Sequence, residues 1–401
     1  MNVLITGAKG FVGSNLCWAL RSIRDGYDTR PQFANLLPLT IFEYDLDSTS
    51  DQLDKWCSQA DFVFNLAGVN RPEDPSEFLT GNFGFASVLL DTLKRHGNAC
   101  PVMLSSSVQA SLEGRFAGSE YGKSKYEGEQ LFRRYSELTG AKVLIYRFPN
   151  LFGKWCRHNY NSVIATFCNN IANDLPITVN NPLTELELLY IDDLVTEMLN
   201  ALIGNETSVD AWGEKDGFCH AGPTDIATLG EIVELLEGFH AARNHISIAD
   251  VTKGSLSQKL YSTYQSYLDP IDFSYELSSH VDVRGSFTEL LHTVDRGQVS
   301  INITKPGVTK GQHWHHSKWE KFIVVAGEGL IKERRIGLDI EGNPYPIMNY
   351  HVNGEHPTVV DMIPGYAHSI TNLSSTADLV TVMWCNEVFD PTNPDTFHME
   401  V

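Results

Sequence analysis

Hydrophobic and polar residues follow two different periods along the chain, and the change of period divides it into two parts. The first part has short apolar runs, which predict buried strands over 1–6, 39–44, 61–68 and 101–107. Between and after these runs, apolar residues recur every three or four positions, as in a helix that packs against a sheet. Strands and helices in this order predict an α/β fold with a Rossmann-like, doubly wound parallel sheet.

The second part follows an amphipathic helix predicted over 229–243. From Phe273 onwards, apolar residues alternate with polar ones in short runs separated by glycine and charge. This pattern predicts short antiparallel strands in a small barrel or sandwich. Residues 244–270 have no strong period, and we interpret them as the connection. We therefore expect two domains, 1–265 and 266–401.

The composition favours a globular protein with reduced cysteines and disfavours nucleic acid and membranes as partners. The 401 residues are 42% hydrophobic and 20% charged, which suits a globular protein with ample core. The seven cysteines are scattered and never form C-x-x-C, so we expect reduced thiols. A formal net charge of -20 disfavours nucleic acid and anionic membrane as partners. No leader-like segment and no apolar run near the roughly 18 residues of a membrane helix is found, so we expect a cytoplasmic protein.

A glycine-rich turn directly follows the first predicted strand. Gly7, Gly10 and Gly13 have the spacing G-x-x-G-x-x-G and precede a helical pattern. Glycine permits the tight turn and the close approach of a pyrophosphate, which binds unpaired N–H groups at the helix start. Asp45 follows the second strand, where an acidic residue bonds the ribose hydroxyls of NAD and an arginine would favour NADP. The strand over 61–68 ends in small residues beside which a cofactor could pass.

A tyrosine and a lysine four residues apart open the next predicted helix. Tyr121 and Lys125 lie on one helix face, where an ammonium lowers the pKa of a phenol and makes it a usable acid or base. The strand over 101–107 ends in three serines, at the edge where ligands bind in a parallel sheet. A surface tyrosine and lysine on an ordinary helix are the alternative interpretation. An anionic substrate would need local cations, for which the chain offers Arg71, Arg147, Lys154 and Arg157.

Histidines cluster in the second part of the chain. His313 and His315 are two apart, so on a strand they point to the same side, where Glu320 and His368 from other strands can join them. Three imidazoles and a carboxylate suit zinc, iron, manganese or nickel. Any one of these histidines alone would more often be a satisfied polar residue.

These motifs resemble two known families. The first part resembles the extended short-chain dehydrogenase/reductase (SDR) superfamily in TGAKGFVG (6–13), NLAGVNRP (65–72), LSSSVQAS (104–111), YGKSK (121–125) and RFPNLFG (147–153). The second part resembles a cupin, because G-x5-H-x-H-x4-E-x6-G is met from Gly307 to Gly327.

The SDR resemblance implies a role for each matching residue. Tyr121 would be the catalytic acid, Lys125 its electrostatic partner and Ser107 the catalytic serine, with Ser106 as the alternative. Contacts to substrate would come from Arg71, Arg147, Asn150 and Asn161. Contacts to an NAD(P)H cofactor would come from Gly7, Gly10, Phe11, Val12, Gly13, Asp45, Leu66, Ala67, Gly68, Tyr121 and Lys125.

The cupin resemblance implies a metal site and a barrel fold. Zinc or another divalent metal would be bound by His313, His315, Glu320 and His368. Acid or base groups at that site stay open among Lys310, His316, Lys318 and Tyr366.

The pairing of the two parts resembles the bifunctional capsular-polysaccharide enzymes. That resemblance implies a UDP-linked 4-keto-6-deoxy-N-acetylhexosamine substrate, epimerised at C3 by the cupin and reduced at C4 to UDP-N-acetyl-6-deoxy-L-talosamine, on the route to UDP-N-acetyl-L-fucosamine. It also implies NADPH, although residues 43–47 carry no basic side chain and leave NADH as the alternative. We expect a homodimer. The competing hypotheses are a single-activity reductase with a structural, dimerising cupin, and a nucleotide sensor.

Overall fold

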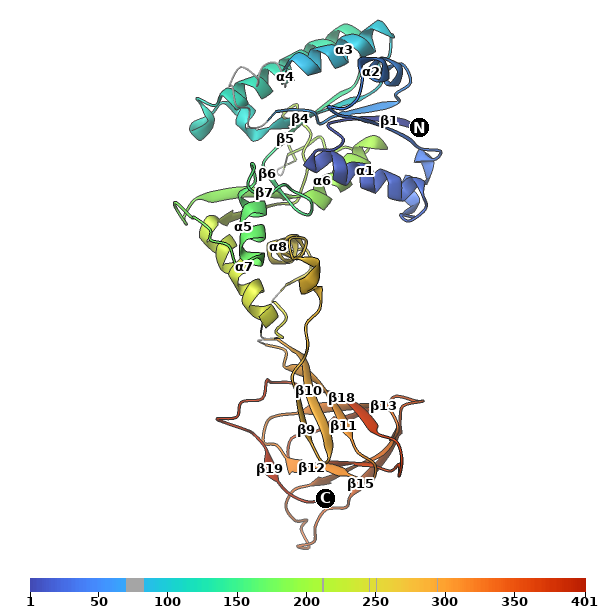
Figure 1. Ribbon diagram of the computed structural model, residues 1–401, viewed down its shortest axis with the longest axis vertical. Coiled ribbons are helices and arrows are strands. Elements are labelled where there is room, and N and C mark those ends of the chain that lie inside the picture. The colour runs from blue at the N-terminus through green and yellow to red at the C-terminus, as the bar shows by residue number, and fades with distance from the viewer. Residues whose placement is uncertain (70–82, 211–212, 245, 250, 294) are drawn as a thin grey trace. The chain divides into compact units, whose positions relative to one another are not determined.

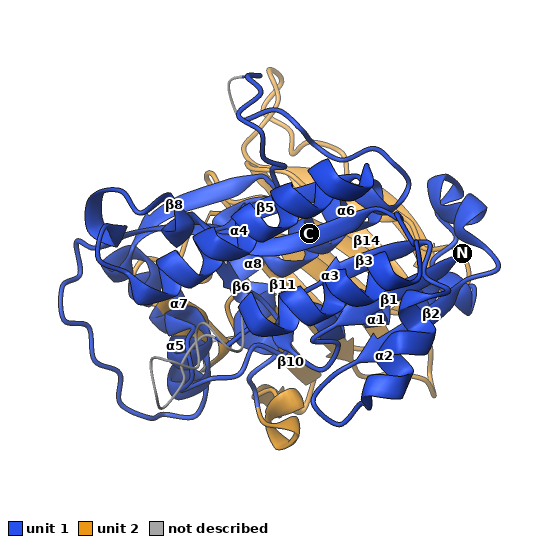
Figure 2. Ribbon diagram, turned by 90° about the horizontal axis from the view of Figure 1, so that it is seen from above, with its two compact units in different colours: residues 1–237, 253–268 blue, residues 238–252, 269–401 orange. Residues whose placement is uncertain are grey.

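The computed structural model describes residues 1–69, 83–210, 213–244, 246–249, 251–293 and 295–401 (Figure 1). The chain forms two compact units. Unit 1 comprises residues 1–237 and 253–268, and unit 2 comprises residues 238–252 and 269–401 (Figure 2). Within the described ranges, no helix is both long and apolar enough to cross a membrane.

Unit 1 is built on a five-stranded parallel sheet, as the apolar runs predict. The strand order is β2-β1-β3-β4-β5, so the order reverses between β1 and β3. The strands are β1 (Asn2–Thr6), β2 (Thr40–Tyr44), β3 (Phe62–Asn65), β4 (Val102–Ser107) and β5 (Val143–Phe148). Ligands of such sheets bind at the carboxyl ends of the strands, at the point where the order reverses.

Both faces of this sheet are covered by helices, because successive side chains of a buried parallel strand point to opposite faces. Val3 and Ile5 share a core with one set of helices, while Leu4 shares a core with the other. The helices on the first face are α1 (Phe11–Arg24) and α6 (Ile191–Leu202), and those on the second are α2 (Ser50–Cys57), α3 (Phe85–Arg95) and α4 (Glu120–Thr139) (Figure 1). The doubly wound α/β prediction is confirmed.

A second, three-stranded sheet and further helices complete unit 1. Its strands β6 (Asn150–Phe152), β7 (Glu185–Tyr190) and β8 (Thr224–Thr228) pair in the order β6-β7-β8. The helices are α5 (Val163–Ala172), α8 (Leu256–Gln265) and α7 (Leu229–Asn244), whose residues from 238 onwards belong to unit 2. Single 3-10 turns are η1 (Pro31–Leu36), η3 (Val108–Ser111), η4 (Gly114–Phe116) and, in unit 2, η5 (Pro270–Phe273).

Helix α8 corrects our interpretation of residues 244–270 as a connection. Leu260 and Tyr264 on this helix are fully buried. The Lys259 ammonium lies 3.0 Å from Asp193 Oδ2 and 2.9 Å from Asp225 Oδ2. These partners come from α6 and from β8, so the helix is held in unit 1 by contacts that its own sequence period does not show.

Unit 2 consists of two antiparallel sheets, as the alternating pattern predicts. One has the order β16-β13-β18-β11-β10-β9 and the other the order β15-β14-β17-β12-β19. The strands of the first sheet are β9 (Ser279–Asp282), β10 (Gly285–His292), β11 (Gln298–Thr304), β13 (Glu320–Ala326), β16 (Val359–Met362) and β18 (Leu379–Cys385). Those of the second are β12 (Thr309–Trp314), β14 (Glu328–Arg335), β15 (Met348–Asn353), β17 (Tyr366–Asn372) and β19 (Phe397–His398).

The core of unit 2 lies between these sheets. Alternate residues of β13 and β14 point inward, and Phe322, Val324 and Ile331 share one apolar cluster with Ile370 and Leu379. The same alternation places polar side chains inward near the start of β13, where Glu320 is only 7% exposed. The inner face is therefore apolar over part of its length and rich in metal-binding side chains over the rest.

Candidate functional site

The glycine-rich turn between β1 and α1 has the geometry of a phosphate site. Gly7 has a φ of +69°, and a Cβ at this position would lie 2.8 Å from the backbone nitrogen of Ala67. A Cβ on Gly13 would lie 2.1 Å from the carbonyl oxygen of Gly7. Gly10 caps α1 without a side-chain hydrogen bond, and no acidic residue occupies the first turn. The first N–H groups of α1 are thus available to a phosphate, so this turn fits a dinucleotide.

The neighbouring predicted cofactor residues lie around this turn. Leu66 N donates to Thr6 O at 3.2 Å and Ala67 N donates to Thr6 Oγ1 at 3.3 Å, which brings the end of β3 beside the turn. Gly68 follows at once, and Phe11 and Val12 are the first two residues of α1, packed against its core. These residues are therefore gathered at one edge of the sheet.

The side chain of Lys9, which lies outside residues 43–47, places a cation at the end of β2. The Asp45 carboxylate accepts a hydrogen bond from Lys9 N at 2.7 Å. The Lys9 ammonium lies 2.5 Å from Asp47 Oδ2, and both side chains are two-thirds exposed. Lys9 belongs to the glycine-rich turn itself, so the signal was present in TGAKGFVG but not in the strand where a basic residue was expected.

Ser107, Tyr121 and Lys125 are brought together at the carboxyl end of β4. Ser119 caps α4 by accepting from Gly122 N at 2.9 Å, which fixes the helix start. The Lys125 ammonium donates to the Ser105 carbonyl at 3.0 Å and lies 5.7 Å from the centre of the Tyr121 ring. Burial raises the pKa of Tyr121 and a hydrogen bond with Ser107 opposes the rise. The raised pKa differs from the lowered one that we expected, and it keeps the phenol protonated, as a proton donor requires.

The other candidate serine has a different partner. Ser106 Oγ donates to Glu129 Oε1 at 2.5 Å, and both side chains are buried. Glu129 also accepts from Arg147 Nε at 2.9 Å and from Arg147 Nη2 at 2.7 Å. Glu129 lies one turn beyond Lys125 on α4. We did not single it out from the sequence, although a spacing of four residues on a helix indicates that the two side chains are neighbours. This division of partners favours Ser107 over Ser106 beside Tyr121.

Glu129 gives a prediction for the pH dependence of the site. Burial lowers the pKa of Lys125 to about 8, and the Glu129 charge opposes the fall. Glu129→Gln removes that charge and leaves the Arg147 cation unpaired, so Lys125 loses its proton at lower pH. We expect the alkaline limb of any rate that depends on the Lys125 ammonium to move to lower pH by on the order of one unit, which corresponds to about 1.4 kcal/mol of lost charge interaction.

The pH profile of three variants checks this expectation. Glu137→Gln changes an exposed glutamate on the same helix and should leave the alkaline limb where it is. The double variant Glu129→Gln/Arg147→Met removes both charges and should move the limb back towards that of the unchanged protein. An unshifted limb in Glu129→Gln would show that this carboxylate has no influence on Lys125.

The predicted substrate residues are less closely grouped. The Arg147 guanidinium is paired with Glu129 and lies 4.0 Å from the centre of the Phe218 ring. Asn150 Nδ2 donates to Glu187 O at 3.0 Å. Asn161 is exposed in the loop before α5, and Arg71 lies outside the described residues. Of the other cations, Lys154 pairs with Asp192, and Arg157 lies 5.2 Å from the centre of the Tyr160 ring.

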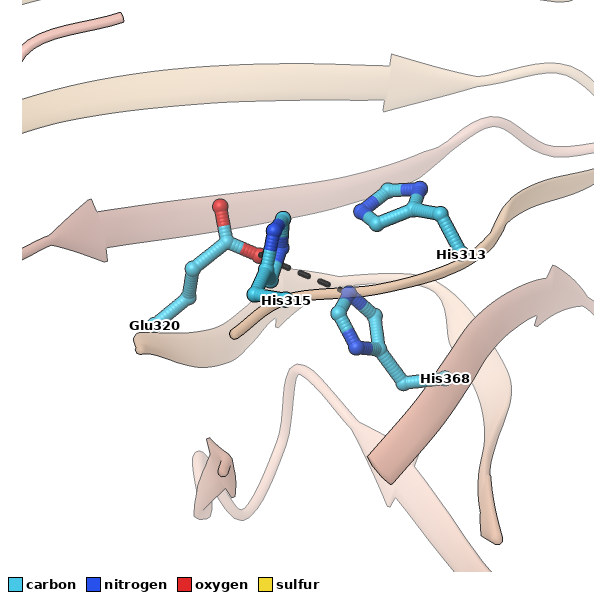
Figure 3. Close-up of side chains that lie close together, drawn as sticks. All are labelled: His313, His315, Glu320 and His368. Atoms are coloured by element: carbon cyan, nitrogen blue, oxygen red, sulfur yellow. Dashed lines mark ion pairs between the residues drawn. The ribbon is translucent and has the colours of Figure 1, made fainter. Parts of the chain in front are cut away.

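The four predicted metal ligands of unit 2 converge (Figure 3). One ligand atom from each of His313, His315, Glu320 and His368 lies within 4.8 Å of the others. Glu320 Oε2 is 3.6 Å from His315 Nε2 and 3.5 Å from His368 Nε2. They come from β12 and the residue just after it, from the start of β13 and from β17. The pairing of distant strands thus assembles what the spacing could only suggest.

The chemistry of this cluster fits a divalent metal. His315 Nε2 and His368 Nε2 are buried and make no hydrogen bond to any described residue, which is costly unless another partner is bound. Burial and the His368 ring lower the pKa of His313 to about 4. Burial favours the neutral acid of Glu320, but the rings of His315 and His368 outweigh it and lower its pKa. A neutral imidazole at His313 and an ionised carboxylate at Glu320 are the protonation states that metal ligands need.

The open acid and base candidates of unit 2 are now placed. Lys310 Nζ donates to Asn302 Oδ1 at 2.6 Å and to Ile303 O at 2.9 Å. Lys318 Nζ is 4.0 Å from Glu320 Oε1 and is largely buried. His316 is exposed and its ring contacts those of Trp314 and Phe397, away from the cluster. Tyr366 is half-buried at the start of β17. Lys318 is therefore the candidate whose charged group lies beside the ligand set.

Comparison with known proteins covers both units. Residues 3–210 match the NAD dependent epimerase/dehydratase family, and residues 280–397 match the polysaccharide biosynthesis C-terminal domain. The UDP-2-acetamido-2,6-beta-L-arabino-hexul-4-ose reductase of Pseudomonas aeruginosa is 40% identical over 401 residues, 100% of this chain and 99% of the relative. UDP-glucuronate 4-epimerase 6 of Arabidopsis thaliana is 28% identical over 279 residues, 59% of this chain and 60% of that protein.

A solved structure extends the similarity to three dimensions. The crystal structure of the capsular polysaccharide assembling protein CapF from Staphylococcus aureus has a TM-score of 0.87 and 46% sequence identity, and 100% of each chain is covered. The chain therefore belongs to the NAD dependent epimerase/dehydratase family and, over its full length, to the two-domain capsular-polysaccharide enzymes of the CapF type.

Proposed function

We propose that this chain converts a UDP-linked 4-keto-6-deoxy-N-acetylhexosamine in two steps, epimerisation at C3 in unit 2 and reduction at C4 in unit 1. The observation that carries the proposal is the presence in one chain of a Ser107–Tyr121–Lys125 group beside a dinucleotide-type turn and of four convergent metal-ligand side chains. We propose on the same grounds that unit 2 is a cupin barrel. The product would be UDP-N-acetyl-6-deoxy-L-talosamine, on the route to UDP-N-acetyl-L-fucosamine.

The reduction follows from the residues of unit 1. Bound NAD(P)H would supply the hydride for C4 of the sugar. Tyr121 gives its phenolic proton to the carbonyl oxygen, and Ser107 donates a hydrogen bond to the same oxygen. The Lys125 ammonium stabilises the phenolate that remains. The ketone thereby gains one hydride and one proton and becomes an alcohol, and the cofactor is oxidised.

The order of the two steps follows from the chemistry of the sugar. Epimerisation removes the C3 proton and returns a proton to the opposite face of C3. The C3 proton is removable only while C4 is a ketone, because the C4 oxygen takes up the negative charge left by that proton. Epimerisation therefore precedes reduction, and the intermediate leaves unit 2 before it binds to unit 1.

The metal site of unit 2 would stabilise the negative charge that forms during epimerisation. A divalent metal, zinc among the candidates, would supply positive charge there and would be held by His313, His315, Glu320 and His368. We propose Lys318 first among the candidate proton carriers, because it is buried beside Glu320.

The cofactor proposal favours NADPH. Lys9 places an exposed ammonium at the end of β2, where a 2'-phosphate would need a cation. Asp45 and Asp47 at the same place favour the ribose hydroxyls of NADH, which remains the alternative. We further propose a cytoplasmic homodimer, the arrangement implied by its resemblance to these families.

Incubation of the full chain with UDP-2-acetamido-2,6-dideoxy-4-keto-hexose and either cofactor tests the proposal. We expect one equivalent of cofactor oxidised per sugar, faster oxidation with NADPH than with NADH, and the L-talo product by NMR. A reduced sugar whose C3 configuration is unchanged would contradict the epimerase activity proposed for unit 2. An absence of cofactor oxidation would contradict the reductase activity proposed for unit 1.

A specific observation favours a second candidate, a single-activity reductase whose cupin metal is structural. Four side chains converge here, and structural metal sites are filled by four protein ligands, whereas catalytic sites keep one position open. In that case a chelator would lower the unfolding temperature of the protein, while any exchange of the C3 proton would be unaffected. His313 is only partly buried, so a sugar would approach a catalytic metal from the side of the site on which His313 lies.

A further inference from the structure

Residues 395–401, here called the 395–401 strap, lie along the strand that carries two of the metal ligands. Within the strap, β19 pairs with β12, with His398 opposite His313 and Phe397 opposite Trp314. The strap also reaches the residue before His313, since Met399 N donates to Gln312 O at 2.9 Å and Val401 N donates to Gln312 Oε1 at 2.7 Å. The strap therefore follows the whole segment that contains His313 and His315.

The Asp395 carboxylate fixes the turn after His315. It accepts hydrogen bonds from the backbone nitrogens of His316 at 2.8 Å, Ser317 at 2.7 Å and Lys318 at 2.9 Å. Ser317 Oγ donates to it as well, at 3.1 Å. This turn joins His315 to Glu320, so the carboxylate holds the backbone between two ligands.

The backbone of the same residue determines the orientation of the His315 ring. His315 Nδ1 contacts the carbonyl oxygen of Asp395. A carbonyl oxygen can only accept, so Nδ1 carries a proton and Nε2 is the ring nitrogen left to bind a metal. That nitrogen is buried, makes no hydrogen bond within the described part of the chain, and lies 3.6 Å from Glu320 Oε2. His368 differs, because neither of its ring nitrogens has a hydrogen-bond partner in the described structure.

We propose that the 395–401 strap is a positioning element of the metal site, which holds the His315 ring through the Asp395 carbonyl so that Nε2 binds the metal. The carboxylate of Asp395 contributes indirectly, because it ties this carbonyl to the turn that follows His315. The inference rests on the proposed metal site and adds to it the device that sets one ligand. Partners of this kind, when removed, lower metal affinity by about 10–100-fold.

The affinity of the full chain for Zn²⁺ alone, measured by competition with a chromophoric chelator, tests this inference without any assay of activity. Asp395→Ala releases the strap from the 316–318 turn, and we expect zinc to bind about 10–100-fold more weakly. Asp395→Asn keeps one acceptor oxygen and should recover part of the loss. Asp390→Ala is the matched control, because the hydrogen bonds that the Asp390 carboxylate accepts from described residues come from Thr392 and Asn393, nearby in the chain. We expect wild-type affinity in this control.

The outcomes distinguish the positioning role of the 395–401 strap from the proposed metal site on which it rests. If the unchanged protein binds no zinc, the proposed metal site is wrong, whatever the strap does. If the unchanged protein binds zinc and Asp395→Ala binds it equally well, or loses no more than Asp390→Ala, the strap does not position His315. Thermal unfolding of each metal-free variant shows whether it is folded. Should Asp395→Ala be unfolded, Asp395→Asn decides, and wild-type affinity in that variant would overturn the inference.

Discussion

Tyr121→Phe is expected to lower kcat for ketone reduction by about 10²–10⁴-fold, the usual contribution of a positioned acid. The substitution removes the phenolic proton and the hydrogen bond with Ser107 but keeps the ring beside Lys125. The sugar and the cofactor should therefore still bind. Oxidation of the cofactor in a single turnover, at saturating substrate, measures this loss directly.

Tyr126→Phe is the control for this prediction. Tyr126 lies five residues further along α4 and is 38% exposed. Its phenol has no place in the proposed reaction, and kcat should stay at the wild-type value. Retention of kcat in Tyr121→Phe would exclude this residue as the proton donor, and with it the reductase assignment of unit 1 in its present form.

His315→Ala is expected to abolish zinc binding and to slow exchange of the C3 proton by about 10²–10³-fold, the effect of losing one charge-stabilising group. The substitution removes a buried nitrogen that has no other partner in the described structure. Unit 1 carries none of these ligands, so reduction of a ketone that is already epimerised should continue. Zinc content, C3 exchange in D2O and cofactor oxidation are the three measurements.

His356→Ala controls for the loss of an imidazole as such. His356 is exposed in unit 2 and belongs to no part of the metal cluster. It should retain zinc and C3 exchange. If His315→Ala loses zinc but exchanges the C3 proton at the wild-type rate, the metal is structural and the epimerisation mechanism for unit 2 is wrong.

The sequence predicted those parts of the fold in which chemistry and local geometry coincide. Gly7, Gly10 and Gly13 lie in a turn between a strand and a helix that the apolar pattern also defines. His313 lies on β12 and His315 directly follows that strand, so their spacing of two in an extended segment already predicted that both point to one side. Both patterns are short-range, and both could be read without knowing where the rest of the chain lies.

Features that depend on distant segments could not be predicted. Helix α8 is stabilised by Lys259 between Asp193 and Asp225, and no period in residues 244–270 indicates this. The Glu129–Arg147 pair joins α4 to β5, which gives Arg147 a partner that spacing did not suggest. The contact of Asp395 with His315 spans 80 positions of the sequence. Each of these arises from tertiary packing of side chains whose local patterns are ordinary.

Proton NMR of the full chain with the UDP 4-keto-6-deoxy sugar in D2O, first without cofactor and then with NADPH, tests the central claim most directly. We predict that the C3 proton signal disappears before any cofactor is added, and that the reduced sugar appears only afterwards. Oxidation of the cofactor with a C3 signal that never exchanges would contradict the account and leave a reductase with a structural second domain.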